Sequence, residues 1–155
     1  TGWYVLIVAS LLYFMFYSPE SFKNMMKFII VTQITAMVIY ILFPNRQDLR
    51  PETFERENIF TQVLQLIYNF DTSTNVCPSL HVAYSVGIAS TWIRERSASV
   101  LTKVLITVFC FLVCISVAFV KQHSVVDIFV AIPVCILAEF ITFGYIYFKK
   151  KDDNK

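Results

Sequence analysis

Long apolar runs separated by polar segments dominate the hydrophobic pattern of this chain. Five runs extend over residues 3–17, 28–43, 80–92, 104–120 and 128–148. A helix of about 20 residues crosses the roughly 30 Å hydrocarbon core of a bilayer, and neutral flanking residues bring the shorter runs toward that length. The pattern therefore predicts an all-α fold, a polytopic membrane helix bundle with at least five transmembrane helices.

The polar segment at 44–77 contains one further apolar pattern. Asn58 is suited to cap a helix, and the stretch IFTQVLQLIYNF that follows it has apolar side chains at helical spacing. These side chains are Ile59, Phe60, Val63, Leu64, Ile67 and Phe70. We expect an amphipathic helix that lies in the membrane interface and guides a lipid, or else a helix that only packs against the bundle.

The composition agrees with a membrane protein. Hydrophobic residues make up 57% of the 155 residues and charged residues only 15%. A soluble bundle with a very apolar core is the alternative, but the last run has no polar face to turn toward water. We expect residues 1–148 to form one membrane-embedded domain and residues 149–155 a polar cytoplasmic tail. Because the first run begins almost at Thr1, which is not an initiator methionine, we also expect that an N-terminal helix of a six-helix fold is missing.

Basic residues indicate the orientation, since cytoplasmic loops are enriched in Lys and Arg. Three consecutive lysines at 149–151 place the C-terminus in the cytoplasm. Counting back one span at a time, the turn at 94–96 and the segment at 23–27 also face the cytoplasm, and both are basic. The segments at 44–77 and 121–127 are then expected on the extracytoplasmic side of the cell membrane.

Three polar segments consequently meet at the outer face. They are FPNRQDLRP at 43–51, CPSLHVA at 77–83 and VKQHSVVD at 120–127. In a compact bundle this placement brings together the ionisable residues Arg46, Arg50, His81, Lys121, His123 and Asp127. Ionisable groups at such a boundary are expensive to desolvate, which favours a functional role for them.

The cations in these segments are suited to an anion. The guanidinium of Arg50 can hold two phosphate oxygens at once, and the ammonium of Lys121 adds a mobile charge. Arg46 is more simply interpreted as a side chain that extends to the interface. Pro78 suits the first position of a helix, which would direct the backbone N–H groups from Ser79 onward at an anion. We predict a phosphate site formed by Arg50, Lys121 and Ser79, with Arg46 as an additional member.

The two histidines supply chemistry that the cations lack. His81 lies one turn inside an apolar helix, where an ionisable side chain indicates function. His123 and Asp127 are four residues apart, so on a helix the carboxylate orients the imidazole through Nδ1 and leaves Nε2 free. Two alternatives stay open: Ser124 and Asp127 form only a helix-capping motif, or the histidines and the aspartate bind a metal, which the nearby cations oppose. We favour phosphoryl transfer, with His123 as nucleophile, Asp127 as its orienter and Lys121 as a phosphate clamp.

The motifs PSLH at 78–81 and KQHSVVD at 121–127 resemble the type 2 phosphatidic acid phosphatase superfamily, the membrane lipid phosphate phosphatases. That family has three motifs in the order K-x6-R-P, P-S-G-H and S-R-x5-H-x3-D. Arg50 and Pro51 match the first motif, Pro78, Ser79 and His81 match the second, and Ser116, His123 and Asp127 match the third. The resemblance extends from the second apolar run to the last.

Three positions depart from the family pattern. Phe43 stands at the first-motif lysine and Val117 at the third-motif arginine, and we expect Lys121 and Arg46 to substitute for these cations. Leu80 replaces the glycine of the second motif, and PSLH is similar to the branch that includes inositol phosphorylceramide synthases and sphingomyelin synthases. That branch transfers a phosphorylated head group to another alcohol, so the acceptor stays open.

The resemblance implies a mechanism without a metal or another cofactor. It implies that His123 becomes phosphorylated while Asp127 orients it, and that His81 protonates the leaving oxygen and then activates water or an alcohol. The expected partners are the bilayer and a lipid phosphate or diphosphate, and we find no nucleic-acid patch. Three functions remain open: a lipid phosphatase, a head-group phosphotransferase and a non-catalytic anion-binding membrane protein. The pattern does not select among phosphatidate, phosphatidylglycerophosphate and polyprenyl diphosphate.

Overall fold

The structure is a computed structural model that describes residues 2–51, 54, 58–70 and 73–152. Within these ranges the secondary structure consists of six helices and no strand, which confirms the predicted all-α class. The helices are α1 (Gly2–Tyr17), α2 (Pro19–Leu42), α3 (Ile59–Phe70), α4 (Leu80–Arg94), α5 (Val100–Phe119) and α6 (Val125–Asp152).

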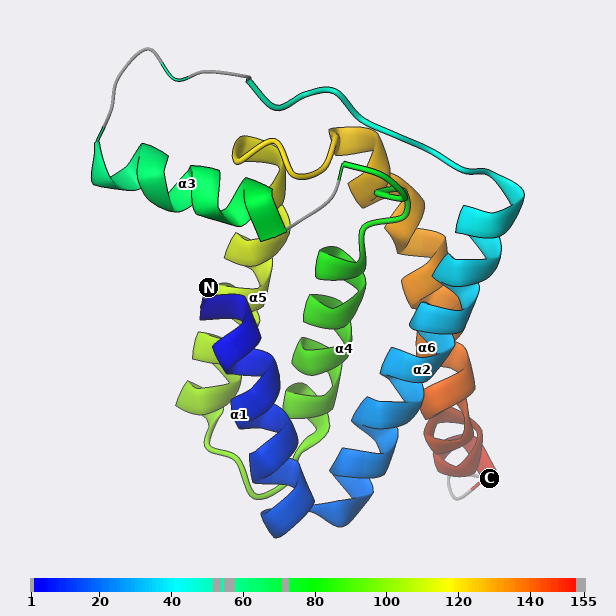
Figure 1. Ribbon diagram of the computed structural model, residues 1–155. Helices are drawn as coiled ribbons and strands as arrows, with labels where there is room; N and C mark the ends of the chain where they lie inside the picture. Colours follow the sequence, from blue (N-terminus) through cyan, green and yellow to red (C-terminus); the bar gives the residue numbers. More distant parts are fainter. Residues whose placement is uncertain (1, 52–53, 55–57, 71–72, 153–155) are drawn as a thin grey trace.

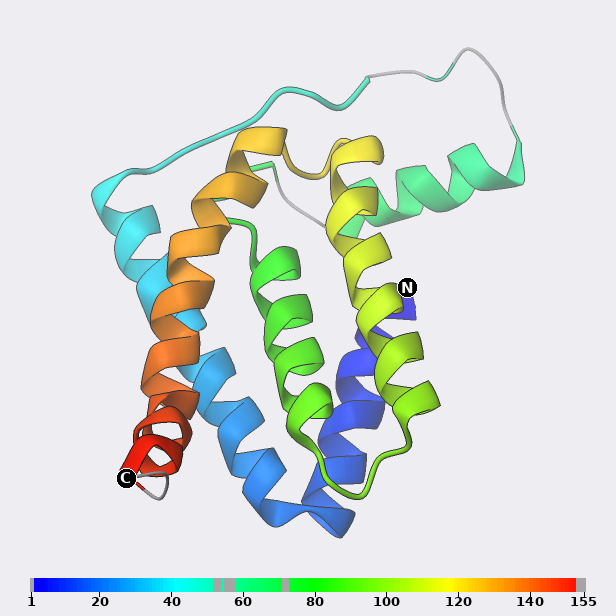
Figure 2. The same ribbon diagram turned by 180° about the vertical axis from the view of Figure 1, so that it is seen from behind.

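Five of these helices form a bundle, and α3 lies across it at one end (Figures 1 and 2). Helix α4 is central, because it packs against α2, α5 and α6, while α1 packs against α2. The predicted amphipathic helix is therefore present as α3. Asn58 caps it as expected, since Asn58 Oδ1 accepts the backbone N–H groups of Phe60 at 2.9 Å and Thr61 at 3.0 Å.

Membrane character is clear in the three longest described helices. Helices α2 and α5 and the Val125–Gly144 part of α6 are long and apolar enough to cross a bilayer, whereas α1 and α4 have 16 and 15 residues. Helix α5 buries only two of its residues and exposes large apolar side chains along its length, as a lipid-facing helix does. Helix α6 continues through residues 149–152 of the predicted tail, and residues 153–155 lie outside the described part.

Small residues on α4 allow its neighbours to approach closely. A Cβ atom at Gly87 would stand 2.5 Å from Cδ1 of Phe28, a fully buried residue of α2. The α2–α4 contact therefore depends on glycine at this position, because even a methyl group would collide with the ring. This contact holds the middle of α4 against the first half of α2.

A buried carboxylate joins the turns at the opposite end of the bundle. Glu95 is 6% exposed and follows the last residue of α4. Its Oε2 accepts the hydroxyl of Ser21 at 2.6 Å, and its Oε1 accepts the backbone N–H of Ser97 at 3.0 Å and the Ser97 hydroxyl at 2.7 Å. Burial alone raises the pKa of Glu95, but the hydrogen bonds from Ser18, Ser21 and Ser97 outweigh it and lower the pKa to about 2.

This lowered pKa predicts a specific acid sensitivity. The Glu95 carboxylate contributes stability that is fully present above the ordinary pKa of about 4.5 and is lost as the pH falls toward about 2. We expect Glu95→Gln to unfold about 1–3 kcal/mol more easily at pH 7 in detergent, and to lose less stability than the wild type between pH 5 and about 2. Thermal unfolding of the wild type and of Glu95→Gln across this pH range tests the prediction. Equal losses of stability in the two proteins as the pH falls would contradict it.

Candidate functional site

The three polar segments do lie at one end of the bundle, as predicted. The chain that follows α2, the start of α4 and the α5–α6 turn all lie at the end where α3 crosses (Figures 1 and 2). Asn45 ties the first segment to the second, because its Oδ1 accepts the backbone N–H groups of Val76 at 2.8 Å and Cys77 at 3.0 Å. Backbone hydrogen bonds from Gln47 to Ser73 and from Asn75 to Asn45 complete this link.

The two histidines are in direct contact. Nδ1 of His81, in the first turn of α4, lies 3.2 Å from Nε2 of His123, in the turn before α6. His123 is buried, with 7% exposure, and His81 is partly buried. The predicted convergence of these imidazoles, 42 positions apart in the chain, is confirmed by this contact.

Asp127 lies behind His123, on the side away from His81. Its Oδ2 stands 3.6 Å from Nδ1 of His123, and the carboxylate is 4% exposed. The same oxygen accepts the backbone N–H of Ser124 at 2.8 Å and the side-chain amide of Gln47. At 3.6 Å the contact between Oδ2 and Nδ1 of His123 is electrostatic and not a hydrogen bond. The negative charge beside Nδ1 favours a proton there, and with that proton in place the Nε2 lone pair can accept the Nδ1 proton of His81.

The predicted helix over both His123 and Asp127 is wrong in one respect. Helix α6 begins at Val125, so His123 lies in the turn before it. Ser124 and Asp127 form the capping motif, in which the Asp127 N–H also donates to Ser124 Oγ at 3.3 Å. Capping and histidine orientation are therefore not alternatives, because the cap itself places the carboxylate near Nδ1.

The start of α4 differs from the predicted anion site. Ser79 is the N-cap and Leu80 the first helical residue, so Pro78 lies before the cap and not at the first helical position. Ser79 is fully buried, its Oγ accepts the Val82 N–H at 3.4 Å, and its own N–H donates to the Asp127 carbonyl at 3.3 Å. Ser79 thus links α4 to α6, and its N–H is already used within the protein.

The three predicted cations occupy different surroundings. Arg50 stacks over the ring of Tyr68 on α3 at 4.8 Å and donates to the Tyr68 carbonyl at 3.3 Å. Arg46 forms an exposed ion pair with Asp48 at 3.0 Å, and its side chain is 69% exposed. Lys121 is exposed in the α5–α6 turn, two residues before His123. The structure brings the histidines and Asp127 into contact. The side chain of Arg46 pairs with Asp48, and that of Arg50 contacts Tyr68.

Three site residues were not identified from the sequence. Gln47 bonds Asp127, and its own Oε1 is buried without a hydrogen-bond partner among the described residues. The ring of Trp3 lies 4.4 Å from the ring of His81, centroid to centroid, and is held by a 3.1 Å hydrogen bond from its Nε1 to Ser85. Burial, the charge of Asp127 and a hydrogen bond to that carboxylate raise the pKa of Cys77 to about 11, so its thiol stays protonated. Two of the three lay within the polar segments singled out above, Gln47 inside FPNRQDLRP and Cys77 at the start of CPSLHVA.

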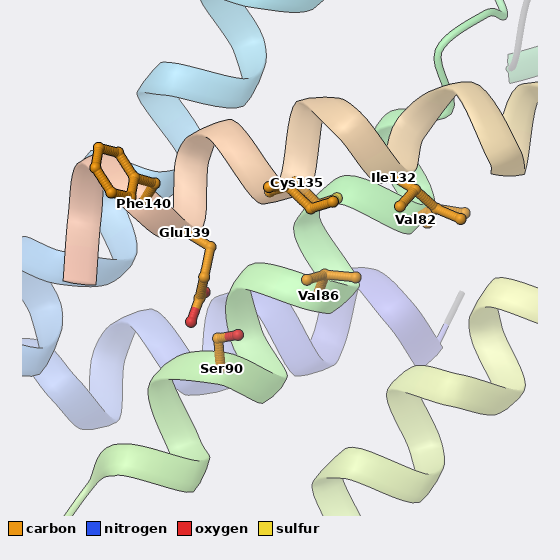
Figure 3. Close-up of a pocket in the computed structure, with 8 residues that line it drawn as sticks. Val82, Val86, Ser90, Ile132, Cys135, Glu139 and Phe140 are labelled. Atoms are coloured by element: carbon orange, nitrogen blue, oxygen red, sulfur yellow. The ribbon is translucent and has the colours of Figure 1, made fainter. Parts of the chain in front are cut away.

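Two cavities flank α4. One, of about 830 Å³, lies between α1, α3 and α5 and includes His81 in its wall. The other, of about 540 Å³, lies between α4 and α6 and contains Ser90 and Glu139 at one end (Figure 3). Glu139 pairs with Arg94, whose guanidinium also stacks over Phe143 at 4.2 Å. The second cavity has no histidine in its wall.

Across the residues that the structure describes, no group of three or more His, Cys, Asp or Glu side chains is arranged to hold a metal ion. Comparison of the chain with protein-family models, with curated proteins and with solved structures gives no match.

Proposed function

We propose that this membrane protein transfers a phosphoryl group from a lipid phosphate through a phosphohistidine at His123. The observation that carries the proposal is the 3.2 Å contact between His81 and His123 with the Asp127 carboxylate behind it. One imidazole is backed by a carboxylate and presents a lone pair, and the other carries a proton beside it. A non-catalytic anion site has no need of such an arrangement.

The proposed reaction has two steps, transfer of the phosphoryl group to His123 and its release to water or an alcohol. Nε2 of His123 attacks phosphorus, the bond from phosphorus to the lipid oxygen breaks, and His81, acting in its cationic form, gives its Nδ1 proton to that oxygen and becomes neutral. Water, or another alcohol, then loses a proton to His81 and attacks phosphorus, and the phosphorus–nitrogen bond breaks. Because 3.2 Å is a hydrogen-bond distance, the rings must separate when phosphorus enters between them.

Asp127 has an electrostatic role in this scheme. Attack through Nε2 makes the imidazole cationic, and a buried carboxylate 3.6 Å from Nδ1 stabilises that charge. For the phosphate oxygens we assign Lys121 and Arg50, since both belong to segments at the same end of the bundle as the histidines. We place this end on the extracytoplasmic side, because the basic turn at 94–96 and the lysines at 149–151 lie toward the other end.

Release of inorganic phosphate tests the proposal. The purified protein in detergent, with a chelator present, should release phosphate from at least one of phosphatidate, phosphatidylglycerophosphate and polyprenyl diphosphate. Addition of a lipid alcohol distinguishes the two acceptors, since a head-group transferase forms a new phosphorylated lipid in place of free phosphate. Equal, background-level turnover by the wild type and His123→Ala on all three lipids would contradict the proposal.

Gln47 is expected to support the reaction indirectly, by holding the Asp127 carboxylate in place. Gln47→Leu keeps the bulk of the side chain but removes the amide that donates to Asp127, so the carboxylate is less firmly placed. A hydrogen bond to a charged group is worth about 1.5–3 kcal/mol, so we expect kcat to fall about tenfold or more. The matched control is Asp48→Asn, one residue further on and exposed, which should change kcat by less than about twofold. Equal kcat values for the two variants would show that Gln47 does not support the reaction.

A further inference from the structure

The cavity between α1, α3 and α5 adjoins the reacting atoms. His81 is part of its wall, and the Nδ1 atom of His81 faces His123. Trp3, whose ring lies against the His81 ring, belongs to the same wall. In the proposed reaction His81 protonates the oxygen of the leaving alcohol, so that oxygen stands at the mouth of this cavity.

The wall of this cavity is suited to hydrocarbon. Leu66 and Ile67 of α3 line one side, and apolar residues of α5, including Leu112 and Val113, line another. No Lys, Arg, Asp or Glu is among the described residues that line it. Its volume of about 830 Å³ lies within the range of roughly 300–1,000 Å³ that is usual for ligand sites. Ser116 and Gln122 add polar groups to this wall beside His81, whereas most of the remaining lining is apolar and buries apolar surface of an alkyl or prenyl chain.

The cavity between α4 and α6 is a poorer candidate for the same chain because of its position. Its lining is almost entirely apolar, with Ser90 and Glu139 at one end, so it could hold hydrocarbon, but it lies away from the reacting atoms. Neither histidine contributes to its wall (Figure 3). A chain lodged there would not lead to the oxygen that His81 protonates.

We infer that the hydrocarbon chain of the leaving lipid alcohol occupies the cavity between α1, α3 and α5, and that the α5 wall, to which Val113 belongs, limits the chain that fits. This inference rests on the proposed function and adds the subsite that selects the substrate. Helix α3 then has a direct role, since Leu66 and Ile67 cover the chain near the phosphate. The selected substrates are phosphate esters with a long hydrocarbon chain close to the ester oxygen.

A pair of identical substitutions on α5 tests this subsite. Val113→Phe puts a ring into the cavity, whereas Val108→Phe puts the same ring on a side chain that is 50% exposed and does not line the cavity. We expect Val113→Phe to lower kcat/KM for hexadecyl phosphate about tenfold or more, and for butyl phosphate by less than about twofold. Val108→Phe should leave both values within about twofold of the wild type. Loss of activity on both esters with Val113→Phe, or on neither, would overturn the inference.

Fluorescence of Trp3 supplies a readout that does not depend on turnover. Hexadecyl phosphate brominated in mid-chain should quench Trp3 saturably in His123→Ala protein, and unbrominated hexadecyl phosphate should reverse the effect. The sequence contains a second tryptophan, Trp92. The quenching of Trp3 is therefore obtained by subtracting the signal of the double variant His123→Ala/Trp3→Phe from that of His123→Ala. Val113→Phe should remove this difference and Val108→Phe should retain it. Equal quenching with both would overturn the cavity assignment. Quenching as expected, together with no phosphate release by the wild-type protein, would overturn only the proposed reaction.

Discussion

Replacement of His123 by alanine is expected to abolish phosphate release, with a loss of at least about 10⁴-fold in kcat. Nε2 of His123 is the atom that attacks phosphorus in the first step of the proposed scheme, and the Asp127 carboxylate lies beside the same ring. The side chain is buried against the start of α6, so the variant must first be shown to fold. Phosphate release from hexadecyl phosphate, normalised to the folded fraction, is the measurement.

His81→Ala is the informative comparison for that result. It removes the acid–base partner and keeps the nucleophile, so we expect a smaller loss of about 10²–10⁴-fold. An ester with a good leaving group needs no proton on its departing oxygen, and such an ester should recover part of the first step in His81→Ala but not in His123→Ala. If His123→Ala retained turnover near that of the wild type, the assignment of the nucleophile would be wrong.

Asp127→Asn is the second substitution for which we expect a large effect. Asparagine retains an oxygen that can accept the Ser124 N–H, so the cap of α6 is preserved. A neutral amide neither stabilises the cationic imidazole nor selects the Nδ1 proton of His123. We expect kcat to fall by about 10³–10⁴-fold with little change in thermal stability.

Ser124→Ala separates catalysis from capping. It removes the hydroxyl that accepts the Asp127 N–H, so it should reduce the free energy of unfolding by about 1 kcal/mol and leave kcat almost unchanged. The opposite pattern, with stability lost in Asp127→Asn and activity lost in Ser124→Ala, would show that Asp127 serves only the cap.

The parts of the structure that follow from regular patterns could be predicted from the sequence. The 3.6-residue spacing after Asn58 indicated α3 and its cap, because both depend on neighbours within one turn. The meeting of His81 and His123 followed from counting spans, since three polar segments separated by complete helices return to the same end of a bundle.

Contacts within irregular segments could not be predicted in the same way. The segment from Pro44 to Arg50 has no period. Gln47 contacts Asp127, and the hydrogen bonds of Asn45 to the segment before α4 help to position Gln47 for that contact. Arg50 matches a motif, yet its partner Tyr68 lies on α3, 18 positions away. Ser79 caps α4 locally through the Val82 N–H, but its hydrogen bond to the Asp127 carbonyl joins distant parts of the chain, and no local pattern reveals it.

Trapping of the phosphorylated protein tests the role of His123 most directly. Wild-type protein is mixed with hexadecyl phosphate labelled in its phosphorus and quenched in alkali during turnover, and the peptide that contains residues 121–127 is isolated. We predict label on His123 that survives alkali, is lost in acid and is absent from His123→Ala protein. Turnover without label on this peptide, or with the label on His81, would contradict the account.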